Sequence, residues 1–111
     1  MPKPGDVVTV DFPGAQGIKR RPVVIVSSDA YHDTRPDVIL AVLTTNIAAS
    51  IAPTDYVLQE WRAAGLHSPS VFRAFLATMP AASIMPIGHL SERDWLQIQI
   101  RLKTAIAVNE K

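Results

Sequence analysis

The chain of 111 residues has a mass of 12.1 kDa, which predicts a single domain of residues 1–111 with no room for a second of ordinary size. Hydrophobic residues make up 48% of it, charged residues 19% and cysteine none, which excludes intrinsic disorder, disulfides, thiolate nucleophiles and cysteine-bound zinc. Eleven basic and ten acidic residues give a formal net charge of +1, so a site for a polyanion must come from local clustering of cations.

The first half of the chain predicts three strands separated by polar loops. Residues 6–12 alternate between apolar and polar side chains, which is typical of a half-buried strand, and a loop is expected at residues 14–19. Residues 22–28 are rich in β-branched side chains and predict a second, buried strand. The polar residues 28–36 read as a loop, and residues 37–45 are the strongest strand candidate.

The second half predicts two further strands, at residues 70–78 and 83–88, and one or two helical turns at residues 59–64 that Gly65 stops. A C-terminal helix is expected to begin at Ser91, because Asp94 follows it at the spacing of a capping box. Its apolar face recurs at helical spacing and consists of Trp95, Ile98, Leu102 and Ile106. These elements predict a mostly β (α+β) domain, a small barrel closed by an amphipathic helix.

The sharpest local feature is the run of cations Lys19, Arg20 and Arg21 before the second strand. An arginine offers a rigid fork of donors that matches two oxygens of a phosphate, so the run is a candidate phosphate site. The alternative is a solvated turn that keeps a strand edge from pairing with other chains. Spacing alone favours this second interpretation.

Two further polar features stand in or beside predicted strands. Thr44, Thr45 and Asn46 end the strand of residues 37–45, where they are either an ordinary polar exit or ligands of a phosphate or base edge. Arg73 interrupts the apolar surface of residues 70–78, and it either reaches solvent at a barrel rim or lines a groove. The sparse aromatic side chains could stack on bases, but packing in the core is the commoner role for aromatics embedded in apolar runs, and this is expected for Phe12, Trp61, Phe72, Phe75 and Trp95.

The chain contains three histidines, and its sequence predicts no membrane-spanning segment. His67 and His89 read as solvated loop residues, whereas His32 lies in a polar loop between two strong strands, where sites are often built. No paired ligand spacing is present, so no metal or cofactor is predicted. The apolar runs are too short to span a bilayer and no signal peptide is evident, so a cytoplasmic protein that enters no membrane is expected.

These features follow one another in a recognisable order. The segments GDVVTVDFP, KRRPVVIVSSD, DVILAVLTTN, AGLHSPSVFRAFLATM and IGHLSERDWLQIQIRL together resemble the MazF/PemK family of toxin endoribonucleases. The resemblance is collinear and covers essentially the whole chain. It implies a barrel of the Src-homology-3 type with a C-terminal helix, a homodimer, metal-independent cleavage of single-stranded RNA, and neutralisation by a cognate antitoxin.

The same resemblance implies roles for individual residues. The catalytic arginine of the family falls on Arg21 and its catalytic serine or threonine on Thr44, while the arginine that some members use falls on Arg73. Around them, Lys19, Arg20, Thr45 and Asn46 are expected to bind the substrate. Two departures stand out: Phe75 replaces an aspartate that some relatives use as general base, and the 14–19 loop lacks their Glu-Gln pair.

With Phe75 in place of a carboxylate, His32 is the remaining titratable candidate for the base. Two alternatives lie outside catalysis. A CcdB-type toxin binds gyrase through an apolar C-terminal dipeptide region, and the polar ending Val108-Asn109-Glu110-Lys111 does not match it. A barrel that binds RNA without cleaving it is the other alternative.

Overall fold

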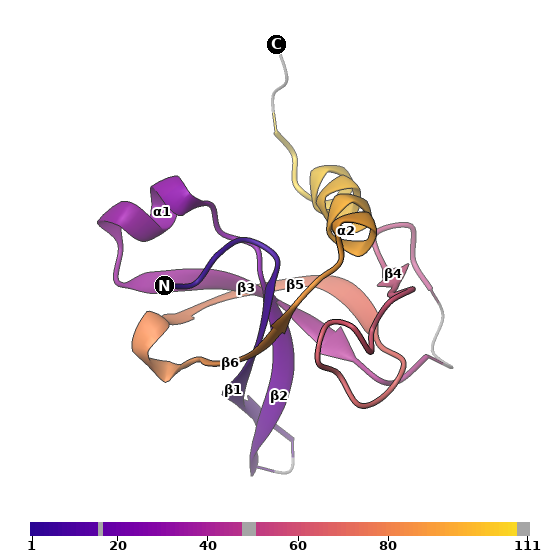
Figure 1. The fold of residues 1–111 in the computed structure, drawn as a ribbon, viewed down its shortest axis with the longest axis horizontal. Helices are drawn as coiled ribbons and strands as arrows, with labels where there is room; N and C mark the ends of the chain where they lie inside the picture. Colours follow the sequence, from indigo (N-terminus) through magenta and orange to yellow (C-terminus); the bar gives the residue numbers. More distant parts are fainter. Residues whose placement is uncertain (16, 48–50, 109–111) are drawn as a thin grey trace.

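The computed structural model describes residues 1–15, 17–47 and 51–108, and in these residues six strands form one antiparallel sheet (Figure 1). The elements in chain order are β1 (Asp6–Gly14), β2 (Gly17–Ile25), α1 (Asp29–Thr34), β3 (Asp37–Thr44), β4 (Tyr56–Val57), β5 (Val71–Pro80), the 3₁₀ turn η1 (Ala81–Ser83), β6 (Met85–His89) and α2 (Glu92–Ala105). The strand order is β4-β5-β3-β2-β1-β6, and the sheet is strongly curled. The predicted mostly β fold with a C-terminal helix is confirmed.

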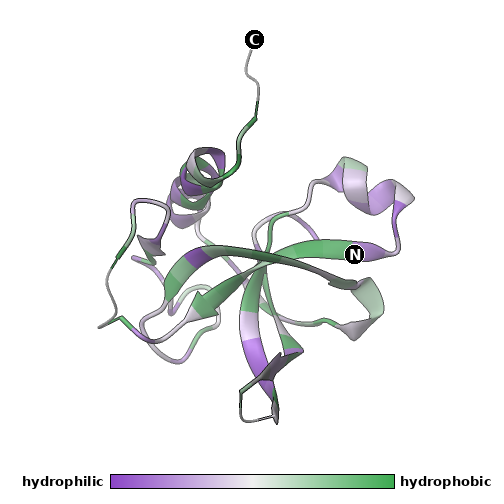
Figure 2. Ribbon diagram, turned by 180° about the vertical axis from the view of Figure 1, so that it is seen from behind, coloured by the Kyte–Doolittle hydropathy of each residue, from purple (hydrophilic) through white to green (hydrophobic). Residues whose placement is uncertain are grey.

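The sheet buries apolar side chains on both faces, because consecutive side chains along each strand point to opposite faces. One core lies between the sheet and α2 and consists of Val7, Val24, Ala41, Leu43, Tyr56, Leu58, Ala64, Leu66, Phe72, Leu90 and Ile98. The other lies on the face that α2 does not cover and consists of Val8, Val10, Val23, Ile25, Val38 and Leu40. Figure 2 shows these strands as green ribbons that become purple toward the tip of the β1–β2 hairpin.

The loop predicted at residues 14–19 is wrong in its extent. β1 continues through Pro13 and Gly14, which pair with Ile18 and Gly17, so the two strands form a tight hairpin. Gly17 has φ +102, which a residue without a side chain adopts at little cost. Residue 16 lies outside the described residues. The cations of residues 19–21 therefore lie within β2 and not at its mouth.

Two local predictions are corrected by hydrogen bonds. The expected loop at residues 28–36 contains α1, whose N-terminus is capped because the Ser28 hydroxyl accepts the N–H of Tyr31 at 3.2 Å. Residues 59–64 form turns and not a helix, although Gly65 after them does adopt the left-handed φ of +87. β4 was not predicted, since two residues carry no detectable alternation.

The start of α2 has the predicted cap and a second, unpredicted function. The Ser91 hydroxyl accepts the N–H of Asp94 at 3.1 Å, as in a capping box. The Asp94 side chain is fully buried, and its carboxylate accepts the hydroxyl of Tyr56 at 2.6 Å. It also accepts the backbone N–H groups of Gln59 at 3.0 Å and Glu60 at 2.8 Å. Asp94 therefore ties α2 to β4 and to the turns that follow it.

The turn at Ala64 and Gly65 also lies against the edge strand β6. A Cβ atom at Gly88 would overlap the carbonyl oxygen of Ala64, and one at Gly65 would overlap that of Ile87. Only glycine permits two backbones to approach this closely. The close approach covers part of β6, whose edge position would otherwise leave its backbone groups open to pairing.

Candidate functional site

Arg21 and Thr44, the two residues expected to be catalytic, lie on the sheet face that α2 does not cover. β2 pairs with β3 so that Val23 lies opposite Val42, and both residues belong to or border the core on that face. Arg21 precedes Val23 by two residues and Thr44 follows Val42 by two, so the alternation of side chains puts both on this face. The Arg21 side chain is exposed and forms no hydrogen bond or ion pair with another described residue. Its charge is therefore free for a ligand.

Arg73 joins this face from the neighbouring strand. It pairs with Val42, which pairs in turn with Val23, so Arg73 lies on the same face as these two residues. Its Nε and Nη2 atoms are buried, and they have no hydrogen-bond partner among the described residues. A buried guanidinium is always charged and is rarely left without an acceptor. Two nitrogens of Arg73 therefore lack an acceptor that an anion could supply.

The Thr44 side chain is held in place by the chain that follows it. Its Oγ1 accepts the N–H of Asn46 at 3.2 Å, which leaves the hydroxyl proton free to donate to a ligand. Asn46 is exposed just beyond β3. Thr45 lies on the opposite face, where it lines a hollow of about 250 Å³ together with His67 and Ser70. The predicted triplet is therefore divided between the two faces.

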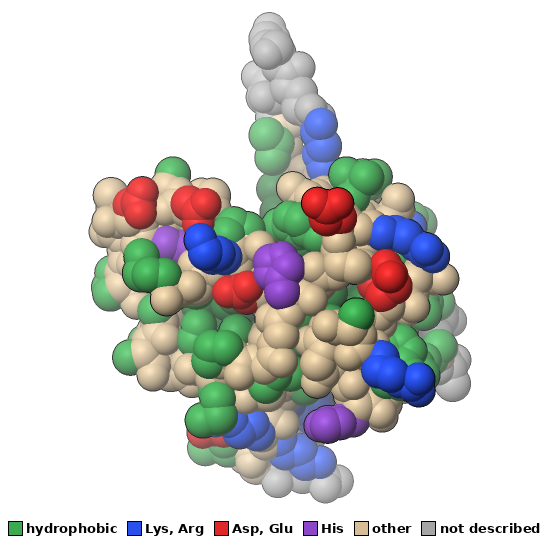
Figure 3. All heavy atoms as spheres, in the orientation of Figure 1, with side chains coloured by type: hydrophobic (Ala, Val, Ile, Leu, Met, Phe, Trp, Pro, Cys, Tyr) green, Lys and Arg blue, Asp and Glu red, His purple; other side chains and the backbone are tan. Residues whose placement is uncertain are grey.

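The predicted run of three cations is divided in the same way. Lys19 pairs with Phe12 and is exposed on the same face as Arg21. Arg20 points to the other face, where its Nη1 lies 2.9 Å from Oδ1 of Asp11. Figure 3 shows Lys and Arg side chains gathered at the lower end of the molecule, over the hairpin. The Arg20 side chain therefore lies on the opposite face of the sheet from that of Arg21, and it already has an acidic partner there.

An apolar hollow of about 260 Å³ adjoins Arg21. It is lined by Phe12, Pro13, Arg21, Val42 and Phe75. The two phenylalanine rings meet edge to face, with centroids 6.2 Å apart. From the sequence, Phe75 was expected to pack in the core or to stack on a base like the other aromatic residues, and it was a departure from an aspartate. Its position two residues after Arg73 in an alternating strand was the signal that it would share the arginine's face.

His32 lies away from these residues. It stands on α1, which precedes β3, whereas Thr44 is the last residue of that strand. Its Nε2 is 2.5 Å from Oγ of Ser27, which also accepts the N–H of Ile39 at 3.0 Å. Its Nδ1 is buried without a partner among the described residues. Within one chain, the predicted base therefore lies at the other end of β3 from Thr44 and outside the hollow beside Arg21.

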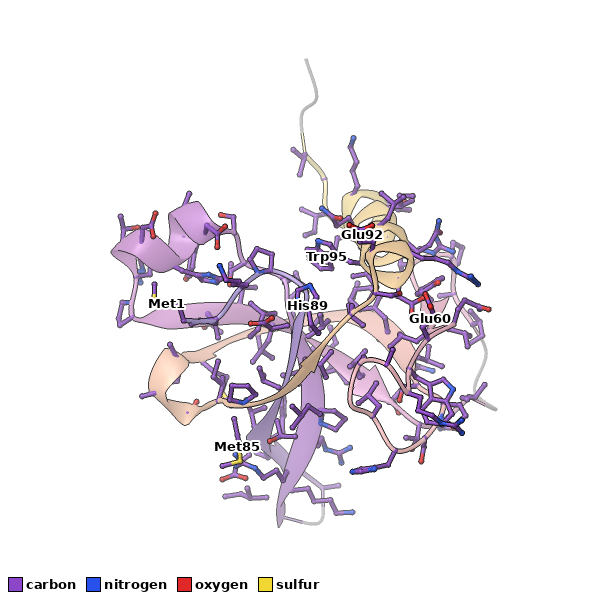
Figure 4. The ribbon with its side chains drawn as sticks, in the orientation of Figure 1. Met1, Glu60, Met85, His89, Glu92 and Trp95 are labelled. Atoms are coloured by element: carbon purple, nitrogen blue, oxygen red, sulfur yellow. The ribbon has the colours of Figure 1, made fainter. Side chains whose placement is uncertain are left out.

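The other two histidines also lie outside the hollow beside Arg21. His67 is exposed on the opposite face, as predicted. His89 is the last residue of β6 rather than a loop residue, and its Nδ1 lies 2.8 Å from Oδ1 of Asp6. Figure 4 places His89 beside the start of α2, near Trp95. Neither histidine therefore replaces His32 as a candidate base.

Acidic side chains are absent from the lining of the hollow beside Arg21. The described residues also contain no cluster of three or more histidine, cysteine or acidic side chains that could hold a metal ion. No described helix is both long enough and apolar enough to cross a membrane. The face can therefore attract an anion and offers it a permanent charge, a hydroxyl donor and an aromatic surface.

The family of the chain follows from a comparison with family models. The model for PemK-like, MazF-like toxins of type II toxin–antitoxin systems matches residues 3–106. The chain belongs to this family. None of the curated proteins compared with this toxin matches it.

Solved structures with the same fold agree with this assignment. A mycobacterial endoribonuclease in complex with its cognate antitoxin is 23% identical, covers 95% of this chain and 94% of its own, and superimposes with a TM-score of 0.77. The Mycobacterium tuberculosis toxin MazF-mt6 is 20% identical over 90% of this chain and 94% of its own, with a TM-score of 0.73. MazF of a MazE–MazF structure from Deinococcus radiodurans is 18% identical over 94% and 93%, with a TM-score of 0.70. The fold of this toxin is therefore the MazF fold that the sequence predicted.

Proposed function

We propose that this toxin is an endoribonuclease that cleaves single-stranded RNA without a metal ion. The observation that carries the proposal is the convergence of Arg21, Thr44 and the partnerless guanidinium of Arg73 on one face of the sheet. Membership of the toxin family and the fold shared with a mycobacterial endoribonuclease support it. We place this activity in the cytoplasm, where single-stranded RNA is available.

The chemistry uses the nucleophile that RNA itself carries. The 2′-oxygen attacks the adjacent phosphorus, a new O–P bond forms, and the bond from phosphorus to the 5′-oxygen breaks. The products are a 2′,3′-cyclic phosphate and a free 5′-hydroxyl. Arg21 and Arg73 neutralise the extra negative charge on the phosphorane, because a guanidinium is permanently charged and presents its donors in a rigid planar fork. Thr44 donates its hydroxyl proton in a hydrogen bond to the same phosphate and holds it in register.

Two proton transfers complete the reaction. The 2′-hydroxyl loses a proton and the departing 5′-oxygen gains one. His32 lies at the other end of β3, and Phe75 occupies the position where relatives carry an acid. We therefore propose that water takes and supplies these protons, and that positioning and charge carry the catalysis. A slow enzyme is the expected consequence.

The proposal predicts that cleavage persists in excess EDTA and depends on one ribose. Replacing the ribose 5′ to the scissile phosphate by deoxyribose should abolish cleavage, since it removes the nucleophile, while the affinity for RNA stays nearly unchanged. Strand scission of a labelled oligonucleotide measures cleavage in EDTA and after the ribose is replaced, and end-group analysis identifies the products. A 5′-phosphate product, or a loss of activity in EDTA that added metal restores, would contradict this mechanism.

A second function, RNA binding without cleavage, is favoured by one observation. Phe75 stands in place of the aspartate that some relatives use as general base. In that case the wild-type toxin would bind the oligonucleotide and leave it intact at any enzyme concentration. The gyrase-binding alternative needs an apolar C-terminal dipeptide region, which the polar ending from Val108 to Lys111 does not match, and residues 109–111 of that ending lie outside the described residues.

We further propose that the toxin is a homodimer and that a cognate antitoxin neutralises it. Exposed apolar side chains along α2, among them Leu96 and Ile100, border a hollow of about 500 Å³ that a second copy would cover. An acidic antitoxin segment would cross the cations of β2. Sedimentation should give twice 12.1 kDa at micromolar concentration, and RNA and antitoxin should compete. A monomer, or simultaneous binding of both ligands, would refute the corresponding part.

A further inference from the structure

We propose that Phe75, together with Phe12, forms a stacking site for a nucleobase next to the phosphate that Arg21 holds. The inference rests on the proposed RNA substrate and adds what the apolar hollow beside Arg21 does. Phe75 is 61% exposed, although the burial of an aromatic ring is normally favourable. A large ring kept at the surface beside an unpaired cation is typical of a surface that binds single-stranded nucleic acid.

Phe75 lies at an irregularity in the pairing of β5 with β3. Ala41 of β3 pairs with Leu76, but its neighbour Val42 pairs with Arg73, so Ala74 and Phe75 have no partners on β3. Bulges of this kind re-aim side chains and are frequent next to functional sites. Ala74 packs on the side of α2, so Phe75 points to the opposite face.

Phe12 completes the surface from the hairpin. Its ring is half-buried and meets that of Phe75 at an angle of 69°, an edge-to-face contact that fixes both rings. Each ring has two faces, and an edge-to-face pair covers only one of them on one partner. The exposed Phe75 ring therefore retains a face on which a base can stack.

The lining of the hollow indicates a base rather than an apolar peptide side chain. Arg21 is the one charged residue among the five that line it, and it is also the proposed phosphate ligand. A nucleotide joins a phosphate to a base through a single ribose, so a phosphate at Arg21 brings a base within reach of the hollow. Stacking on aromatic rings tolerates any base, whereas a cation beside the ring serves no purpose for an apolar peptide side chain.

The role of Phe75 is therefore to position substrate. Some relatives carry a catalytic base at this position, whereas in this toxin Phe75 contributes to the binding of RNA. A substitution of Phe75 should raise KM and leave kcat nearly unchanged, whereas loss of a proton-transferring group would lower kcat.

The test combines protein variants with changes in the RNA. The RNA carries deoxyribose at the scissile position, so that binding is measured without cleavage. Phe75→Leu keeps apolar volume but loses the ring, and it should weaken binding about tenfold, the loss of one base–aromatic stack. Phe75→Trp should bind as the wild type does, and RNA should quench the added tryptophan fluorescence. Met85→Ala is the matched control, because Met85 is 57% exposed and lies away from the hollow.

An RNA lacking one base next to the scissile phosphate identifies the partner of Phe75. The wild type should bind it about tenfold more weakly than the intact RNA, and Phe75→Leu should bind the two RNAs equally. Equal losses in the two proteins, or unchanged binding by Phe75→Leu, would overturn the inference while wild-type cleavage still supports the proposed function. If Phe75→Leu loses affinity only for the antitoxin, the hollow is a protein site and the inference is wrong. If the wild type binds no RNA, both proposals fail.

Discussion

Arg21→Ala is expected to lower the rate of RNA cleavage at least a hundredfold while the protein stays folded. Its guanidinium is exposed and free of described partners, so its removal takes charge from the transition state and little from the core. The loss of one such contact costs about 3 kcal/mol or more in activation free energy. Stability should change by about 1 kcal/mol or less, as for other exposed positions. Single-turnover cleavage and thermal unfolding measure the two quantities.

Arg20→Ala is the matched control for this experiment. Arg20 is the neighbouring cation, but it lies on the opposite face and is ion-paired with Asp11. Its removal changes the net charge by the same amount, so any loss caused by general attraction of RNA appears in both variants. Arg21→Lys should recover only part of the rate, since an ammonium group cannot make the two parallel bonds of a guanidinium. Near wild-type cleavage by Arg21→Ala would refute the assignment.

Asp94→Ala should give the largest loss of stability. The carboxylate is fully buried and accepts hydrogen bonds from the Tyr56 hydroxyl and from the N–H groups of Gln59 and Glu60. Truncation leaves these donors without an acceptor, at about 1–3 kcal/mol for each that stays dry. We expect a loss of about 3 kcal/mol or more in the free energy of unfolding, measured by urea denaturation.

The control for Asp94→Ala is Glu92→Ala, two residues away in the same first turn of α2. Glu92 is exposed, and Figure 4 shows it at the start of that helix. Its substitution removes a favourable charge near the helix N-terminus, at a cost of about 0.3–1 kcal/mol. If the two variants unfold at the same urea concentration, Asp94 does not anchor the turns after β4.

The same contact predicts a loss of stability at alkaline pH. Burial and then the hydrogen bond to Asp94 raise the pKa of Tyr56 from 10.0 to about 12. The folded state therefore binds the phenolic proton more tightly than the unfolded state does. This stability is complete below about pH 10 and is lost as the pH rises from there through about 12. Tyr56→Phe should remove that part of the alkaline loss.

A second tyrosine must be controlled in that measurement. The Tyr31 hydroxyl donates to Asp37 at 2.6 Å, and this hydrogen bond raises the pKa of Tyr31 as well. The comparison is therefore best made in a Tyr31→Phe background. An unchanged alkaline slope after Tyr56→Phe in that background would contradict the predicted role of Tyr56.

The sequence by itself determined the approximate positions of the described strands other than β4, and where the last helix begins. Alternation of apolar side chains along residues 6–12 and 37–45 is a local property, and it survives in β1 and β3. Ser91 and Asp94 form a helix cap, and they are only three residues apart in the sequence. The order of such segments also carried the family resemblance, which the family model confirms.

The tertiary structure alone decided which polar residues share a face. Strand register puts Arg21 of β2, Thr44 of β3 and Arg73 of β5 on the same face of the sheet. This register depends on pairing between strands distant in sequence.

The tertiary structure also decided how far apart candidate residues lie along the strands and which polar side chains are buried. The fold puts His32 and Thr44 at opposite ends of β3, and it brings Phe75 of β5 against Phe12 of β1. Asp94 reads locally as a solvated helix cap, but packing against β4 buries it. A local pattern contains no information about such contacts, since residues far apart in the chain make them.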